Sequence, residues 1–403
     1  MARLLLVFGC LNGISIYAVT PLAAPDQLML ATDVYRHAAG LVLEGQGIYH
    51  EHPPDRPGYT FLYPPLVIVL FLPHALIDSG VGAFAFHTAL NVLAALATAA
   101  LVLRMLERRA VVLEDIDRAL IVVFFLVSSY SAIQFINGQV NLWLALAFAV
   151  ALNAVDRRRM ELAGVAFALA ALVKVFPAIM GVWLLRIRAW RAVAAAMLVG
   201  LTGLLLGTAL FGIDLTQTYL LDVLLGRFEG STYDGRPDAT DSVDGIHRQL
   251  AVIWPAGTAY HTVIGLVVVT SLLVGGLARV DTVLERDTAA LATITAVLLF
   301  LPVQPLYFPL IGVPLLLLLY RIPPGRHRVV LIIGTALTMV HLDLESAVFG
   351  LELVPVPSMI SAPLINALDV IFTFVLPPTL GIWFLLVGCV LVQWRARSSL
   401  SEP

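Results

Sequence analysis

The first acidic side chain placed to do acid–base chemistry is Asp33, in the stretch Asp33-Val34-Tyr35. Apolar residues recur at helical spacing over residues 34–42, which predicts a short amphipathic helix that ends at Gly45-Gln46-Gly47. At the start of that helix, Asp33 has two compatible interpretations. Its carboxylate could cap the helix by accepting backbone N–H bonds, or it could act as a general base toward a substrate hydroxyl.

The elements that position Asp33 follow from a very apolar composition. Of 403 residues, 60% are hydrophobic and 13% are charged, whereas soluble proteins are about 45–50% apolar and about 25% charged. This excludes a disordered chain, a disulfide scaffold and an ordinary cytosolic enzyme, and it predicts an all-α polytopic membrane protein. Cys10 and Cys389 lie in apolar runs and imply no disulfide. A chain with one lysine offers no lysine-rich patch for nucleic acid.

The apolar runs predict about 10–12 transmembrane helices. They lie at residues 4–24, 61–77, 81–103, 119–136, 140–155, 162–185, 192–213, 259–278, 288–303, 305–320, 329–345 and 366–393. If every run crossed the membrane, three basic loops would fall on the wrong side. The conflict disappears if 61–77 and 162–185 enter and leave on one side, as re-entrant or juxtamembrane helices. Proline supports this interpretation, because Pro64-Pro65 and Pro177 interrupt these two runs.

This topology places both termini in the cytoplasm together with the basic segments. Those segments are Arg104–Arg118, Asp156–Glu161, Arg186–Arg191, Arg279–Arg286, Arg321–Arg328 and Arg395–Arg397. We expect one membrane domain over residues 1–403, with an outer loop at 25–60 and a large outer loop at 214–255. A transporter or lipid flippase would concentrate ionisable residues at mid-bilayer, and a non-catalytic scaffold would not need polar residues to converge. The outer polar segments therefore favour an enzyme whose site is external, with a transporter or flippase as the alternative.

Several motifs resemble the membrane glycosyltransferases of the GT-C type, and more narrowly glycosyltransferase family 87. The similar stretches are Asp33-Val34-Tyr35, Phe61-Leu62-Tyr63-Pro64-Pro65, Asn137-Gly138-Gln139-Val140-Asn141-Leu142, and Gly164 through Lys174 to Pro177. Together they cover roughly residues 30–190. The C-terminal half departs from the family pattern, because Leu301–Phe308 lacks the family's tryptophan and histidines. The segment 244–250 likewise stands where the family tends to have Asn-Gln-Ser.

The resemblance implies a lipid-linked donor, a polyprenyl or dolichyl phosphate hexose and most simply mannose, and a glycolipid or glycan acceptor. It implies an inverting transfer in which Asp33 takes the proton of the acceptor hydroxyl. The leaving phosphate needs cations and N–H donors, which Lys174, His247 and Arg248 could supply. The last two could instead balance acidic residues of a solvated loop. Lys174, the only lysine, lies too deep to snorkel and could equally be paired structurally.

Amides and tyrosines of the outer segments complete the expected substrate site. Asn137, Gln139, Asn141 and Gln304 could hydrogen-bond to a sugar, although Asn137 also begins an ordinary tight turn. Tyr35 and Tyr63 could stack on a sugar or belong to an interfacial belt. No strong metal motif is present, and no metal or cofactor is expected. The excess of arginine over lysine fits a prokaryotic plasma membrane, with membrane lipid and no nucleic acid as partners.

Overall fold

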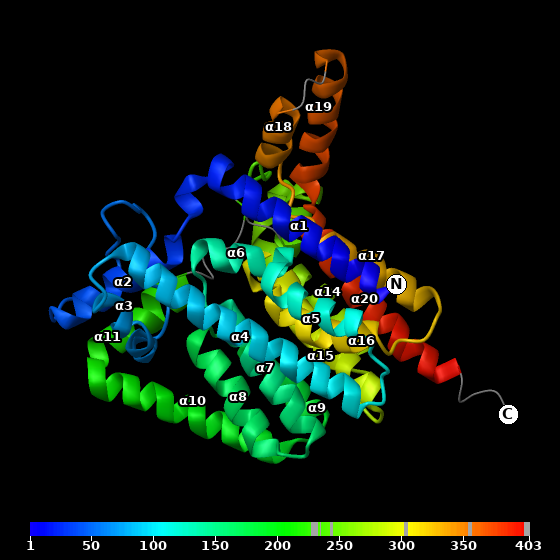
Figure 1. Ribbon diagram of the computed structural model, residues 1–403, viewed down its shortest axis with the longest axis horizontal. Helices are drawn as coiled ribbons and strands as arrows, with labels where there is room; N and C mark the ends of the chain where they lie inside the picture. Colours follow the sequence, from blue (N-terminus) through cyan, green and yellow to red (C-terminus); the bar gives the residue numbers. More distant parts are fainter. Residues whose placement is uncertain (227–232, 234, 242–244, 302–304, 354–356, 399–403) are drawn as a thin grey trace. The chain divides into compact units, whose positions relative to one another are not determined.

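The computed structural model describes residues 1–226, 233, 235–241, 245–301, 305–353 and 357–398, and these contain helices and no β-strand. Within the described residues, six helices are long and apolar enough to cross a membrane. They occupy Ala2–Ala23, Gly80–Arg108, Asp115–Asn137, Trp190–Phe211, Pro255–Gly276 and Pro377–Arg395. Shorter apolar helices accompany them, so the chain is an all-α polytopic membrane protein (Figure 1).

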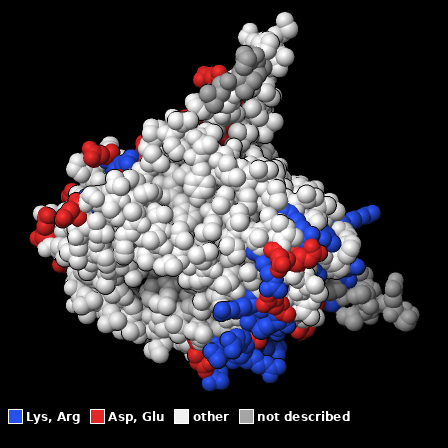
Figure 2. All heavy atoms as spheres, viewed as in Figure 1, with Lys and Arg blue, Asp and Glu red and all other residues white. Residues whose placement is uncertain are grey.

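The chain divides into two compact units. One contains residues 16–127 and 131–230, and the other contains residues 1–15, 128–130 and 231–403. Helices α1 (Ala2–Ala23) and α6 (Ser129–Asn137) have residues in both units. On the face drawn in Figure 2, most of the surface carries neither acidic nor basic side chains, as expected of a lipid-facing surface.

The first unit contains residues 25–60, the first predicted outer loop, and the two predicted half-crossings. Its elements are η1 (Pro25–Gln27), α2 (Leu30–Leu43), η2 (Pro65–Leu70), α3 (Leu72–Ala75), α4 (Gly80–Arg108), α5 (Asp115–Val127), α7 (Asn141–Asp156), α8 (Met160–Val173), η3 (Phe176–Ile179), α9 (Met180–Arg186), α10 (Trp190–Phe211), α11 (Ile213–Thr218) and a π-helical turn, Tyr219–Leu225. Packing of α8 against α7 and α10 forms much of its interior. In α10, by contrast, most side chains are exposed, which fits a helix that faces lipid.

Residues 160–186 form a helical hairpin, as the sequence predicts for the second half-crossing. The chain becomes extended at Lys174, after α8 has ended, and Pro177 then lies in the short helix η3. The Phe167 and Trp183 ring centroids, one from α8 and one from α9, lie 6.0 Å apart. Glu161 forms an ion pair with Arg191 at 2.5 Å, so the chain leaves the hairpin at the end where it entered.

The first half-crossing, residues 61–77, also begins and ends at one place. It contains only the short helices η2 and α3, and both of its flanks contact α2. The Tyr63 hydroxyl lies 2.7 Å from the Tyr35 hydroxyl before it, and Arg36 donates to the carbonyl of Asp78 after it. Neither half-crossing is a spanning helix, which confirms the predicted interruption of both runs.

Three predicted basic loops lie together at one end of the first unit. Arg109, after α4, forms an ion pair with Asp156, after α7, at 2.7 Å. The ion pair of Glu161 and Arg191 adds the beginnings of α8 and α10 to the same end, because α8 follows α7 directly. These contacts match the common side that the positive-inside rule requires of these loops.

The second unit contains the C-terminal helices. They are α13 (Ile246–Ile253), η5 (Pro255–Gly257), α14 (Thr258–Gly276), α15 (Val283–Phe300), η6 (Pro305–Tyr307), α16 (Pro309–Leu319), α17 (Arg326–Thr338), α18 (Leu344–Leu353), α19 (Ser358–Phe374) and α20 (Pro377–Ser398). The sequence predicts one run over 366–393, but the structure ends α19 at Phe374 and begins α20 at Pro377. The pair Pro377-Pro378 accounts for this break, because proline lacks a backbone N–H and fits best in the first turn of a helix, where it stands in α20.

Candidate active site

Helix α2 positions Asp33 inside its first turn rather than at its cap. Met29 is the N-cap, in the left-handed region with φ 61°, and no side chain caps the helix. The backbone N–H of Met29 donates to the carbonyl of Ile136 at 2.9 Å, and the N–H of Asp33 donates to Met29 as the first helical bond. The interpretation of Asp33 as an N-cap is therefore wrong, and its carboxylate is available for another role.

The carboxylate of Asp33 pairs with Arg56, a residue that the sequence did not single out. Its Oδ2 atom accepts a hydrogen bond from Nε of Arg56 at 3.1 Å and forms an ion pair with Nη2 at 3.0 Å. The same guanidinium donates to the carbonyls of Asp26 at 2.5 Å and Leu28 at 2.7 Å. Arg56 thus joins the chain before α2 to the carboxylate on α2 and fixes one of its two oxygens. The other oxygen, Oδ1, accepts no hydrogen bond from the described residues and lies beside Gly80.

A second part of the site is a buried cluster around Tyr35. The Tyr35 ring stacks on Phe71 at a centroid distance of 4.0 Å, and only 2% of the residue is exposed. Its hydroxyl lies 2.7 Å from that of Tyr63 and donates to Oε1 of Gln139 at 3.2 Å. Three segments that are far apart in the sequence, α2, the start of the first half-crossing and the loop before α7, therefore meet through these side chains.

Lys174 joins this cluster from the tip of the helical hairpin. Its Nζ lies 3.5 Å from Oε1 of Gln139 and 5.6 Å from the centroid of the Tyr63 ring. A cation over an aromatic face at this distance is attracted by the ring quadrupole. The lysine is half-buried. Its ammonium group therefore has protein partners and is also partly accessible from outside the protein. The only lysine of the chain is thus directed at the same amide oxygen as Tyr35.

The turn that presents Gln139 is built around Gly138. This glycine has φ +69°, and a Cβ there would overlap the hydroxyl of Thr32 on α2. Asn137 donates to the carbonyl of Gln27 at 2.6 Å, which fixes the turn to the chain before α2. The carbonyl of Gln139 accepts from Asn91 on α4 at 3.1 Å. Gly138 allows this turn to approach α2 closely, and the hydrogen bonds of Asn137 and Gln139 hold the turn there.

A buried histidine pair supports the same carbonyl. His74 on α3 and His87 on α4 are hydrogen-bonded at 3.1 Å between Nε2 and Nδ1. The second nitrogen of His87 lies 3.4 Å from the carbonyl oxygen of Gln139, and the Trp143 ring stacks on His87 at 5.0 Å. Both histidine side chains are buried, and their hydrogen bonds hold the Gln139 carbonyl in place.

The predicted amides separate into one that reaches the cluster and two that do not. Gln139 contacts Tyr35 and Lys174. Asn137 is buried against the backbone of Gln27, and Asn141 is fully buried and donates to Oε1 of Gln134 at 2.9 Å. Asn137 and Asn141 thus hold the turn and the start of α7.

Asp33 and Tyr35 project from different sides of α2. In an α-helix, two residues that are two positions apart in the sequence project about 200° apart around the helix axis. Asp33 is accordingly part-exposed and paired with Arg56, whereas Tyr35 is buried with Tyr63 and Gln139. The site consists of two parts on one helix, which we call the Asp33–Arg56 pair and the Tyr35 cluster (Tyr35, Tyr63, Gln139 and Lys174).

An apolar groove adjoins the Tyr35 cluster. Its cavity volume is about 200 Å³, and it is lined by residues next to the cluster in sequence, Pro64 and Pro65 after Tyr63 and Val175 after Lys174. Helix α10 supplies another wall at Gly200, Gly203 and Gly207. Glycines let the backbone of α10 come close, since a Cβ at Gly203 would meet Leu172 at 2.6 Å. The groove could hold a slender apolar chain beside a cation.

The predicted phosphate contacts of α13 lie in the other unit and have structural partners. Arg248 is fully buried and donates to the carbonyls of Phe372, Asp238 and Asp241 at 2.6 to 2.9 Å. His247 is also buried, and burial together with the nearby His261 lowers its pKa. Arg248 thus ties the chain before α13 to the end of α19. The remaining predicted residue, Gln304, lies outside the described residues.

Sequence reasoning missed Arg56 and the histidine pair for different reasons. Arg56 follows the turn Pro53-Pro54 in a segment without periodic pattern, where an arginine has no sequence signal for its partner. His74 follows the helix-breaking Pro73, and a polar residue inside an apolar run is a usable signal of a buried network.

Comparison with known protein families matches residues 61–305, more than half of the chain, to Glycosyltransferase family 87. The matched range includes Tyr63, Gln139, Lys174 and the lining of the apolar groove. A search of curated proteins finds no match to the chain.

Proposed function

Because this chain belongs to glycosyltransferase family 87, we propose that it transfers a hexose, mannose first, from a polyprenyl or dolichyl phosphate to a hydroxyl group of a glycolipid or glycan. The transfer inverts the anomeric carbon and takes place on the external face of a prokaryotic plasma membrane, with both termini in the cytoplasm. The observation that carries this proposal is the Tyr35 cluster, in which the only lysine reaches Gln139 and Tyr63 beside an apolar groove.

The groove and the lysine together suit a donor with an apolar chain and a phosphate. An isoprenoid chain in the groove between η2, the tip of α8 and α10 would bring its phosphate to the segments that hold Lys174 and Tyr63. Lys174 would then stabilise the phosphate as it departs, since cationic hydrogen bonds to phosphate are strong. Gln139 could turn its amide toward a sugar hydroxyl while Tyr35 and Tyr63 hold it in place.

Asp33 is the proposed general base. The acceptor hydroxyl gives its proton to Oδ1 of Asp33, its oxygen forms the new bond to the anomeric carbon, and the bond to the donor phosphate oxygen breaks with the electron pair leaving on phosphate. Arg56 holds Oδ2 and orients the carboxylate. Asp33 is part-exposed, so an acceptor hydroxyl can reach it. Because Asp33 and the Tyr35 cluster lie on different sides of α2, the proposed transfer requires the donor sugar to extend from the cluster past α2 toward Oδ1 of Asp33.

The test is sugar transfer in reconstituted vesicles. Radiolabelled polyprenyl-phosphate mannose is supplied with host lipid extract to wild type, Asp33→Asn and Asp26→Asn. Asp26 is a matched control, because it is an exposed aspartate of the same loop whose side chain contacts only Gln27 in the described residues. We expect Asp33→Asn to lower transfer by about 10²–10⁴-fold, the usual contribution of a positioned base, and Asp26→Asn to leave it unchanged.

Two results would contradict the proposal. Equal transfer by wild type and Asp33→Asn would remove Asp33 as the base. No transfer by wild type from mannosyl, glucosyl or other lipid-phosphate donors would remove the lipid-phosphate donor, and would leave a transporter or lipid flippase as the better description of the site.

A further inference from the structure

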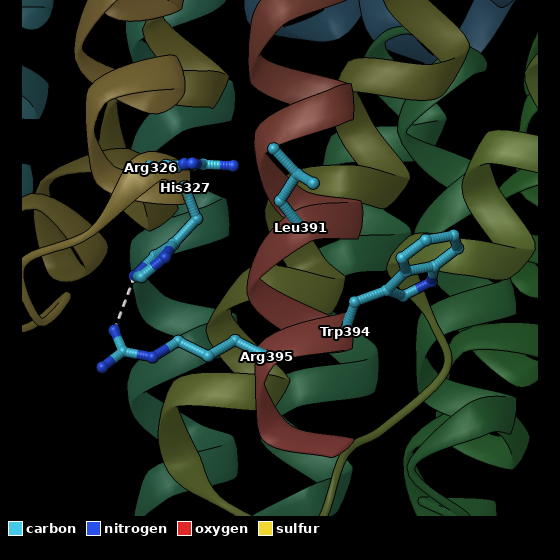
Figure 3. Close-up of a pocket in the computed structure, with 5 residues that line it drawn as sticks. All are labelled: Arg326, His327, Leu391, Trp394 and Arg395. Atoms are coloured by element: carbon cyan, nitrogen blue, oxygen red, sulfur yellow. Dashed lines mark hydrogen bonds between the residues drawn. The ribbon is translucent and has the colours of Figure 1, made fainter. Parts of the chain in front are cut away.

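The ends of α17 and α20 enclose a basic pocket that the proposed transfer does not use. Its volume is about 300 Å³, and five residues line it, Arg326, His327, Leu391, Trp394 and Arg395 (Figure 3). Arg326 and His327 are the first two residues of α17, and the other three lie in the last turns of α20. All five belong to the second unit.

Close packing of the two helices fixes the pocket. A Cβ at Gly334 of α17 would lie 2.8 Å from the backbone nitrogen of Leu385, and a Cβ at Gly381 of α20 would lie 2.5 Å from that of Thr338. A Cβ at Gly388, about two turns closer to the pocket than Gly381, would meet the Leu331 side chain at 2.7 Å. The two backbones therefore touch along their length, and the start of α17 is held against the end of α20.

The pocket gathers positive charge without an acidic lining residue. Arg326 is exposed, and the structure gives its side chain no hydrogen bond or ion pair with any described residue. Arg395 donates to the carbonyl of Pro324 at 3.0 Å and lies 3.2 Å from Nε2 of His327 (Figure 3). The same His327 nitrogen lies 3.1 Å from the carbonyl of Pro323. Burial, and to a lesser extent the nearby guanidinium of Arg395, lower the pKa of His327.

An apolar and aromatic wall completes the pocket. Trp394 is 62% exposed, although tryptophan is a large apolar residue, and Leu391 lies one turn before it on α20. An exposed tryptophan beside arginines at the end of an apolar helix is typical of the membrane–water interface. The pocket thus offers a cationic side for an anion and an apolar side that continues toward the lipid-facing length of α20.

We propose that this pocket binds the phosphate headgroup of an anionic phospholipid. Arginine provides a planar fork of N–H donors that matches phosphate oxygens, and basic pockets between transmembrane helices are suited to anionic headgroups on the cytoplasmic side. The headgroup phosphate is held by Arg326 and Arg395, and the first methylene groups of the acyl chains lie along Leu391 and Trp394. The tryptophan and leucine favour a lipid over free phosphate, which has no apolar part to bury.

The experiment uses the purified full-length protein and the fluorescence of Trp394. Phosphatidylglycerol with brominated chains is titrated into the protein in detergent, and quenching is compared with brominated phosphatidylcholine. Trp394→Phe identifies the part of the signal that comes from the pocket. We expect saturable quenching by phosphatidylglycerol that is absent in Trp394→Phe, with about tenfold weaker binding in Arg326→Gln, the loss of one charge-assisted contact.

Arg328→Gln is the matched control, because Arg328 lies two residues further along α17 and does not line the pocket. It should bind phosphatidylglycerol as the wild type does. Equal quenching by phosphatidylcholine, or equal weakening in Arg326→Gln and Arg328→Gln, would overturn the proposal. Displacement of the lipid by millimolar inorganic phosphate would also overturn it, because the pocket would then be a site for the free anion.

Discussion

Lys174 and Arg248 are both cations that the sequence suggests for a donor phosphate, and the structure gives them opposite environments. Lys174 is half-buried at the tip of a hairpin, with an amide oxygen and an aromatic face as its recorded partners. Arg248 is fully buried and donates to several backbone carbonyls. A cation that holds carbonyls of its own chain fixes the fold, whereas we propose that a cation next to the groove meets a ligand. The difference lies in the partners, and residue type alone does not show it.

The largest expected effect is the loss of folding stability in Arg248→Met, which distinguishes Arg248 from Lys174. Arg248→Met removes the Arg248 donor from the carbonyls of Phe372, Asp238 and Asp241. We expect a loss of about 3 kcal/mol, since each buried polar group left unsatisfied costs about 1–3 kcal/mol. The apparent melting temperature in detergent should fall by about 10 °C. Arg248→Lys is the control, because it keeps the charge but cannot reach all these oxygens, and it should also be destabilised.

A wild-type melting temperature in Arg248→Met, together with lost transfer, would contradict this comparison. It would return Arg248 to the role of phosphate ligand.

Lys174→Met should show the reverse behaviour. Methionine keeps the length of the side chain and removes the charge, so we expect transfer efficiency with the lipid-phosphate donor to fall by about 10- to 100-fold, the range of one charge-assisted hydrogen bond. The melting temperature should stay close to that of the wild type, since Lys174 is at the tip of the hairpin. Kinetics with Lys174→Arg serve as the control that retains a cation.

Normal transfer by Lys174→Met with a lowered melting temperature would make Lys174 a structural residue like Arg248. The contrast between the two cations would then disappear.

The smallest expected effect tests how far the Tyr35 cluster depends on its hydroxyl groups. Tyr35→Phe keeps the stack on Phe71 and removes the bonds to Tyr63 and Gln139, so we expect a loss of about 1 kcal/mol of stability. Transfer should fall less than tenfold. Tyr130→Phe is the matched control, because Tyr130 is also a buried tyrosine whose hydroxyl is hydrogen-bonded, here to Thr338. Both residues belong to the second unit, away from the Tyr35 cluster. Loss of this hydroxyl should lower stability and leave transfer unchanged.

A fall in transfer that is the same in both tyrosine variants would show that the cluster has no special role beyond stability.

Much of the fold is readable from the sequence because it depends on local patterns. The predicted short amphipathic helix forms, with Val34, Ala38 and Leu41 buried as the spacing predicts, although it begins at Leu30, before Asp33. The break at Lys174 follows from the nearby Pro177, and the close return of both half-crossings follows from the distribution of arginines. Such features require only neighbours along the chain and the positive-inside rule.

The partners of the candidate site are not readable in this way. Arg248 bonds to Phe372, 124 residues further along the chain, and no local pattern pairs them. Helix α2 begins at Leu30, where its N-cap Met29 bonds to Ile136 of another segment, and local spacing could not show that Asp33 lies inside the first turn and not at the cap. Long-range contacts of this kind decide whether a polar residue is structural or available to a substrate.

The length of α8 has a consequence for the membrane around the hairpin. Its 14 residues rise about 21 Å, which is shorter than the hydrocarbon core of about 30 Å. With the ends of the hairpin at one surface, its tip stops about 9 Å before the opposite headgroups. A bilayer accommodates such a mismatch by thinning locally. In the proposed topology, a phosphate of the outer headgroup layer then reaches the depth of Lys174 across only a thin shell of hydrocarbon.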